Sequence, residues 1–309
     1  MTIPFIDLQA QRRRLGQPLE DAILAVVRSG AWVMGPQIAE LEAALARFGE
    51  APHVLSCGSG TEALMLPLMA WGIGPGDAVF CPSFTFAATA EVVPLVGAEP
   101  VFVDILPDTY GLDADKLDAA IAAVRREGRL VPRAVIAVDL FGQPADYPAL
   151  AEVTRKHGLK LIADSAQGFG CTLNGRHPIH WADVTTTSFF PAKPLGCYGD
   201  GGAVLTKDAA LHERMVSLRV HGQAAPSDVA GQAFAHDAVH HPVLHTALEG
   251  LTLLVAAAPV WTAFVWGDTR RWWLIGLITV VQVPVTLIGF VPVVSPYVHL
   301  TLFALALLL

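Results

Sequence analysis

Residues 161–167 read LIADSAQ, an apolar run that leads into a carboxylate and then into small or polar residues. A short run that is apolar throughout is typical of a strand buried on both faces of a sheet. We predict this strand near residues 160–164, and six further strands near residues 53–57, 78–81, 100–104, 134–138, 184–188 and 202–206. Helical spacing of apolar residues separates most of them, at 61–71, 84–95, 114–127 and 146–157, and also precedes them at 18–28 and 36–48. This alternation predicts an α/β fold with a mostly parallel seven-stranded sheet, covered by helices on both faces.

Composition changes near Gln223. The chain has 20 Lys and Arg and 28 Asp and Glu residues, but only six of these 48 follow Gln223. The part before it has the composition of an ordinary soluble α/β domain. We therefore predict an α/β domain over 1–223, a linker over 224–242 and an apolar helical tail over 243–309.

The tail contains stretches 243–266 and 272–294, and a third apolar run at 297–309. A helix needs about 20 apolar residues to cross a bilayer. The tail therefore predicts two or three transmembrane helices and membrane association. Four histidines lie in or beside the linker, without a cysteine or a closed ligand set, so no metal site is predicted there.

Charge and the N-terminus exclude other classes of function. The net charge is −8 and no basic stripe is present, which argues against nucleic-acid binding. The opening residues MTIPFIDLQAQRRR contain no apolar signal region. We therefore expect the domain before Gln223 to be cytoplasmic.

Ligands of a parallel sheet bind at the carboxyl ends of its strands, and the first unusual segment there is residues 56–62, SCGSGTE. Small residues such as Gly60 let the backbone approach an anion, and a helix N-terminus supplies free N–H groups. Thr61 adds a hydroxyl. An ordinary strand–helix turn with an N-cap explains the segment equally well.

Asp164 ends the LIADSAQ strand, where its carboxylate would be partly buried. A buried carboxylate is costly unless a cation pairs with it. A protonated pyridine nitrogen would be such a partner, as in a pyridoxal 5′-phosphate (PLP) site. A capping aspartate is an equally good interpretation of this residue taken alone.

Lys193 lies in residues 187–196, TSFFPAKPLG, with no acidic residue beside it. Such surroundings predict a desolvated amine with a lowered pKa, which favours a Schiff base. Ser188 could reach a phosphate from the same loop, whereas an exposed lysine on a turn is the alternative. The glycine-rich residues 199–202 permit positive φ angles and a tight return of the chain, so we expect them to shape the backbone rather than to take part in chemistry.

Together these segments resemble the DegT/DnrJ/EryC1/StrS aminotransferases. The resemblance runs from Ile3 to Gln223 and includes PFIDL at 4–8, PSFTF at 82–86 and RVHGQ at 219–223. The string SFFPAKPLGCYGDGGA at 188–203 is most similar to the branch that aminates a UDP-linked 3-keto-N-acetylglucosaminuronate.

The resemblance implies a fold-type-I PLP enzyme that aminates a nucleotide-linked keto sugar, with glutamate as donor, for surface polysaccharide biosynthesis. It implies that Lys193 binds the cofactor covalently and moves a proton, and that Asp164 pairs with the pyridine nitrogen. It also implies a homodimer. Further implied cofactor contacts are Phe86 on the ring, Gln167 near the 3-hydroxyl, and Gly60, Thr61 and Ser188 at the phosphate.

The sequence departs from the family after Gln223. The family's asparagine that reaches a neighbouring subunit's phosphate, and its small C-terminal domain, are not found there, which predicts impaired activity. The tail instead faintly resembles CtaG-type cytochrome oxidase assembly proteins, at HPVLH (241–245) and PVTLIGF (284–290). Two alternatives stay open: a membrane-embedded binding or assembly protein with an inactive aminotransferase-like domain, and a fusion of unrelated segments. A dehydratase-like relative is disfavoured, since such relatives tend to lose the Schiff-base lysine.

Overall fold

The computed structural model describes residues 6–222. The predicted linker at 224–242 and the predicted apolar helices of 243–309 lie outside these residues. Within residues 6–222, no helix combines the length and the apolar character needed to cross a membrane.

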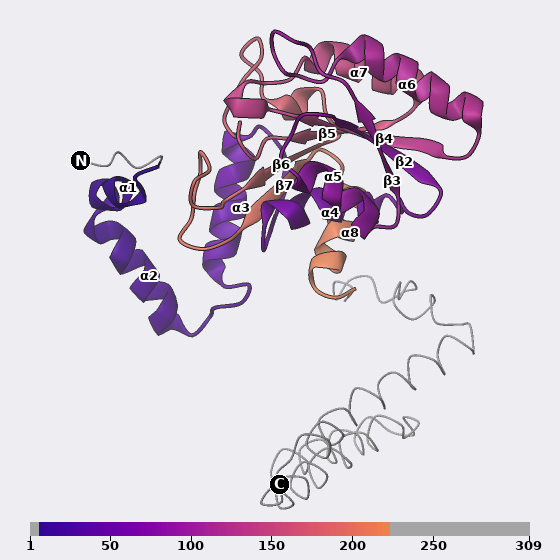
Figure 1. Cartoon of the computed structure of the whole chain (residues 1–309). Helices are drawn as coiled ribbons and strands as arrows, with labels where there is room; N and C mark the ends of the chain where they lie inside the picture. The colour runs from indigo at the N-terminus through magenta and orange to yellow at the C-terminus, as the bar shows by residue number, and fades with distance from the viewer. Residues whose placement is uncertain (1–5, 223–309) are drawn as a thin grey trace, which may run out of the picture. The chain divides into compact units, whose positions relative to one another are not determined.

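One sheet of seven strands organises the described residues (Figure 1). The strands are β1 (His53–Cys57), β2 (Asp77–Pro82), β3 (Glu99–Val103), β4 (Val131–Val138), β5 (Lys160–Asp164), β6 (Val184–Ser188) and β7 (Gly202–Thr206). They lie in the order β1-β7-β6-β5-β4-β2-β3. Five adjacent strands, β6, β5, β4, β2 and β3, run parallel to one another. Strand β7 is antiparallel to both of its neighbours, β1 and β6. The predicted mostly parallel seven-stranded sheet is confirmed.

Helices cover both faces of the sheet (Figure 1). The helices of the described residues are α1 (Leu8–Leu15), α2 (Gln17–Ser29), α3 (Pro36–Phe48), α4 (Gly60–Ala70), α5 (Ala88–Leu95), α6 (Ala114–Glu127), α7 (Tyr147–His157) and α8 (Ala209–Arg219). Helices α1 and α2 bury no residue and lie away from the sheet (Figure 1). On one face, α4 and α5 pack on strand residues that include Ile136 and Ile162. On the other, α6 and α7 pack on their neighbours Val135 and Leu161. Successive strand residues point to opposite faces, so β5, which is buried on both sides, is apolar from Leu161 to Ala163. Strand β6 is also buried at every residue, although its sequence is VTTTS.

Helix α5 begins later than the sequence predicts. A helix was expected over 84–95, but the chain becomes helical only at Ala88. The reason is that Ser83 still continues the strand pairing, since its N–H donates to the carbonyl of Val103 at 2.8 Å. The chain must then turn away from the sheet before a helix can start. Residues 84–87 therefore form a loop at the carboxyl edge of the sheet.

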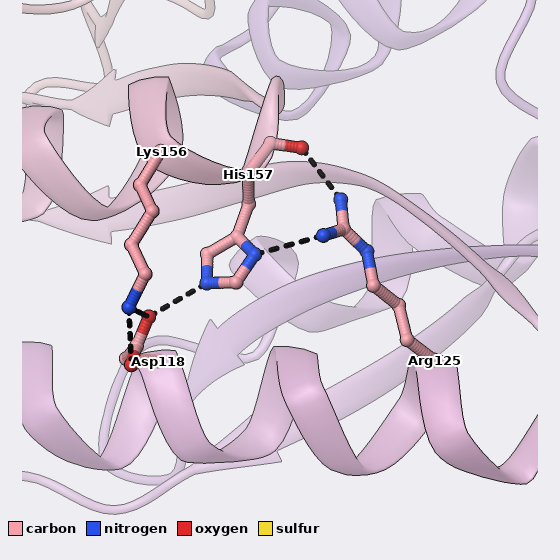
Figure 2. Close-up of polar contacts among 4 residues, drawn as sticks. All are labelled: Asp118, Arg125, Lys156 and His157. Atoms are coloured by element: carbon pink, nitrogen blue, oxygen red, sulfur yellow. Dashed lines mark hydrogen bonds and ion pairs between the residues drawn. The ribbon is translucent and has the colours of Figure 1, made fainter.

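Four polar side chains tie α6 to α7 (Figure 2). Arg125 Nη1 lies 2.9 Å from Nδ1 of His157, and His157 Nε2 lies 2.6 Å from Oδ1 of Asp118. Because a guanidinium can only donate, Nδ1 accepts and Nε2–H donates to the carboxylate. Lys156 contacts both oxygens of Asp118 at 2.8 and 2.9 Å. Hydrogen bonds from Lys156 first, and from His157 second, lower the pKa of Asp118. The cluster fixes the two outer helices against each other.

Candidate active site at the carboxyl edge of the sheet

Asp164 is the last residue of β5 and its side chain is buried, with 5% of the residue exposed. Its Oδ2 accepts the hydroxyl of Thr89 at 2.9 Å, and its Oδ1 accepts the N–H of Ala166 at 3.2 Å. The sequence prediction that Asp164 ends a strand is confirmed, and the carboxylate is more deeply buried than expected. Thr89, which comes from α5, was not predicted.

Burial raises the pKa of the Asp164 carboxyl above its ordinary value. The hydrogen bonds from Ala166 and Thr89 oppose this rise, and so does the positive charge of Lys193. The effect of burial therefore exceeds the combined effect of these neighbours, and the ionised form of the carboxylate is disfavoured. A cationic partner would stabilise it further.

Lys193 lies in the turn that follows β6, where its N–H donates to the carbonyl of Phe190 at 2.8 Å. Its Nζ lies 5.5 Å from the centroid of the Phe86 ring. Lys193 is half-buried and Phe86 is 63% exposed. The predicted desolvation of the lysine is thus only partial, because the loop at 84–87 and the turn after β6 both face outward at the edge of the sheet.

A close backbone approach joins Gly60, the first residue of α4, to Ser188, the last residue of β6. A Cβ placed on Gly60 would lie 2.6 Å from the Cβ of Ser188. The Ser59 hydroxyl caps the helix by accepting the N–H of Glu62 at 3.1 Å. Because an α-helix leaves its first N–H groups without internal partners, the start of α4 can receive an anion beside the Ser188 hydroxyl. Thr61 lies in the same first turn.

Residues distant in sequence hold the segment that leads into α4. Both the N–H and the hydroxyl of Ser56 donate to Oε1 of Glu42, each at 2.8 Å. Arg219, in α8, donates to the same Oε1 at 2.6 Å and to the carbonyl of Ser56 at 3.1 Å. This largely buried ion pair fixes the end of β1 just before the Gly58–Gly60 turn. Neither Glu42 nor Arg219 was predicted, because nothing local in the sequence connects α3, β1 and α8.

The glycine-rich residues 199–202 shape the backbone, but not through the positive φ angles that glycine permits. None of these glycines has a positive φ. Instead, a Cβ on Gly202 would lie 2.4 Å from the carbonyl oxygen of Ser59. Gly202 is needed because β7 passes directly beside the turn before α4.

Gln167 is half-buried in the turn that follows β5, three residues beyond Asp164. Its expected place near a cofactor hydroxyl stays a prediction. A cavity of about 330 Å³ lies elsewhere, between the loops that follow β3 and β4 and the turn at Leu173–Asn174. None of the seven predicted site residues lines it. The predicted residues form a separate group at the ends of β5 and β6 and the start of α4.

Gly60→Ala provides a test of the close approach. The added methyl group would overlap Ser188, so we expect the folded state to lose about 2 kcal/mol and anion binding at the start of α4 to weaken. Thermal unfolding and titration with inorganic phosphate measure the two effects. Gly74→Ala is the matched control, since its Cβ would meet only the carbonyl oxygen of Val96, at 3.5 Å. Equal behaviour of the two variants would contradict the assignment.

Comparisons with known proteins agree on one family. The sequence profile of the DegT/DnrJ/EryC1/StrS aminotransferase family matches residues 14–245. The UDP-2-acetamido-2-deoxy-3-oxo-D-glucuronate aminotransferase of Pseudomonas aeruginosa is 45% identical over 221 residues, which cover 72% of this chain and 60% of that protein. The chain therefore matches about three fifths of the length of this relative.

Solved structures show the same likeness. A DegT DnrJ EryC1 StrS aminotransferase from Brucella abortus superimposes with a TM-score of 0.69 at 52% identity, covering 70% of this chain and 58% of that one. A Streptococcus pneumoniae protein solved in a PLP form has a TM-score of 0.62 at 30% identity, covering 68% and 57% of the two chains. The chain described here belongs to the DegT/DnrJ/EryC1/StrS aminotransferase family.

Proposed function

We propose that this chain is a PLP-dependent aminotransferase that exchanges an amino group between an amino acid and a nucleotide-linked keto sugar. The observation that carries the proposal is that the Lys193 amine, beside the Phe86 ring, lies within electrostatic range of the buried Asp164 carboxylate at the carboxyl edge of the sheet. Lys193 is close enough to lower the pKa of Asp164, while burial still holds that pKa above its ordinary value. A second cation beside Asp164 would therefore stabilise the ionised form of its carboxylate, and a protonated pyridine ring would be such a cation.

The residues present fit PLP at each of its functional groups. Asp164 would face the ring nitrogen, and Phe86, whose ring lies under the Lys193 amine, would cover one face of the ring. The phosphate would lie against the first turn of α4, where Gly60 keeps the backbone of α4 close to Ser188. Thr61 would add a hydroxyl there, and Gln167 would lie near the 3-hydroxyl.

PLP, when bound, supplies a ring that accepts an electron pair from the substrate carbon. The chain's own groups make this possible in two ways. Asp164 would keep the ring nitrogen protonated, because an ionised carboxylate in a buried site stabilises a proton on its partner. Lys193 would hold PLP covalently, and its Nζ would carry a proton to and from the reacting carbon.

The identity of the sugar rests on the P. aeruginosa relative, whose name specifies a UDP-linked 3-oxo sugar. We propose a UDP-linked 3-keto sugar as substrate and glutamate as amino donor. A homodimer and membrane association through 243–309 stay predictions of the sequence.

Two measurements test the proposal. Purified protein incubated with PLP should develop a visible absorption band, and borohydride should fix the cofactor on the peptide that contains Lys193. In the reverse direction, a UDP-linked 3-amino sugar and 2-oxoglutarate should yield glutamate. A chain that retains no PLP, or that carries it on another lysine, would overturn the proposal. A chain that binds PLP at Lys193 but forms no glutamate would restrict it to cofactor binding.

A further inference from the structure

Asp139 is a buried carboxylate that plays no part in the proposed chemistry. It follows β4 directly and is fully buried. Its Oδ1 accepts the hydroxyl of Tyr147 at 2.6 Å and the N–H of Ala145 at 3.2 Å. Its Oδ2 accepts the hydroxyl of Ser165 and, more weakly, the thiol of Cys171 at 3.5 Å. Among residues 6–222, no cation forms an ion pair with it.

Three contacts join Asp139 to the turn that carries the proposed cofactor ligands. Its backbone N–H donates to the carbonyl of Asp164 at 3.0 Å, and its carboxylate binds the Ser165 side chain. Gly168 closes the same turn, since its N–H donates to the carbonyl of Ser165 at 3.1 Å. A Cβ on Gly168 would lie 2.5 Å from the Cβ of Asp139. Asp139 therefore contacts both ends of the segment from Asp164 to Gly168, with Gln167 inside it.

Burial disfavours the charged form of Asp139. Burial raises its pKa from 3.8 to about 6, against hydrogen bonds from Ser165, Tyr147, Ala145 and Cys171 that lower it. A neutral isostere would avoid the desolvation of a charge. The carboxylate, in contrast, only accepts hydrogen bonds, so it can hold the Tyr147 and Ser165 hydroxyls in one orientation at the same time.

We propose that Asp139 is a positioning residue of the cofactor site. Through Ser165 and the packing of Gly168, it sets the position of the turn that presents Asp164 and Gln167. The inference rests on the proposed PLP site. It predicts that the loss of this one carboxylate weakens cofactor binding even though Asp139 does not touch the cofactor.

Asp139→Asn is the decisive variant, because it keeps the size of the side chain and changes only its hydrogen bonding and charge. The NH2 group of the amide must then lie where one carboxylate oxygen accepted hydrogen bonds. We expect the dissociation constant for PLP to rise about tenfold, as for the loss of one hydrogen bond to a charged group. We also expect the pH midpoint of the bound-PLP absorption band to shift, because that band depends on the position of Asp164.

Asp183→Asn is the matched control. Asp183 also anchors β5 through its backbone, since its Oδ2 accepts the N–H of Leu161 at 2.9 Å, but it does so at the opposite end of the strand. The control should leave the PLP affinity and the pH midpoint unchanged. If Asp139→Asn fails to fold, Ser165→Ala removes the same contact from the side of the turn and should weaken PLP binding in the same direction.

Amide hydrogen exchange of residues 164–168 in the cofactor-free protein separates this inference from the proposed function. Exchange at these amides should accelerate in Asp139→Asn and not in Asp183→Asn. Wild-type protein that binds no PLP would refute the proposed site, whereas the exchange result would still report on the turn. Unchanged exchange together with wild-type PLP affinity in Asp139→Asn would overturn the positioning role.

Discussion

Replacement of Lys193 by alanine is expected to abolish covalent retention of PLP and to slow amino-group transfer by roughly three orders of magnitude. The reason is that, in the function proposed above, one amine both holds the cofactor and carries the proton to and from the reacting carbon. Among residues 6–222, the positive charge that lowers the pKa of Asp164 comes from Lys193 alone. The visible absorption band, borohydride fixation and glutamate formation measure the loss.

Lys207→Ala is the matched control for this prediction. Lys207 is an exposed lysine after β7 whose Nζ donates to the carbonyl oxygen of His180 at 3.2 Å. It should bind PLP and transfer amino groups as the wild type does. Retention of a borohydride-fixed cofactor by Lys193→Ala would show that another amine holds PLP.

Asp164→Asn should leave PLP bound but slow amino-group transfer by about 10²- to 10³-fold. The amide oxygen can still accept the N–H of Ala166, and the amide NH2 can donate to the hydroxyl oxygen of Thr89, so both local contacts can be kept. The amide carries no charge, however, and cannot keep the ring nitrogen protonated. Single-turnover rates with glutamate, compared with PLP affinity, distinguish this chemical defect from a loss of binding.

The same variant has an opposite effect on the cofactor-free protein. The pKa of Asp164 is raised in the folded state, so its stabilising contribution is present when the carboxyl is protonated and is lost as pH rises past 3.8 toward the raised value. Asp164→Asn removes this loss. Without PLP, we expect the variant to unfold at an equal or higher temperature than the wild type at neutral pH, with the difference vanishing in acid.

Asp146→Asn is the control for both measurements. Asp146 is exposed and caps α7, a role that asparagine also fills well. It should match the wild type in transfer rate and in the pH dependence of unfolding. A slower rate in Asp146→Asn, or a full transfer rate in Asp164→Asn, would contradict the assigned role of Asp164.

The sheet was predictable because its strands carry their own boundaries. The predicted bounds of β5, β6 and β7 match the structure. In β5 and β7 an apolar run ends at Asp164 and at Thr206, whereas β6 reads VTTTS and suits a strand because Val and Thr are β-branched. Helix α1 was not predicted, because every residue in it is exposed and no apolar stripe marks it. Helix α8 was missed too, although Leu211 and Met215 bury one side of it.

The sequence pattern predicts some residues of the candidate site and misses others. Asp164 and Ser188 stand out because each ends a buried strand, and Lys193 stands out because it follows one. Thr89 and Asp139 do not, since their importance depends on which elements the fold brings together. Thr89 reaches Asp164 across 75 residues of chain, and Asp139 acts on a turn that lies one strand away. Partners of this kind follow from tertiary packing rather than from local pattern.

The pairing of the first strand with the last one delays completion of the fold during synthesis. The neighbour of β1 in the sheet is β7, with His53 opposite Thr206, so β1 leaves the ribosome long before its partner exists. An unpaired strand edge is prone to pair with other chains. We expect nascent chains that stop before Gly202 to aggregate through β1, and chains that extend past Thr206 to gain protease resistance in one step.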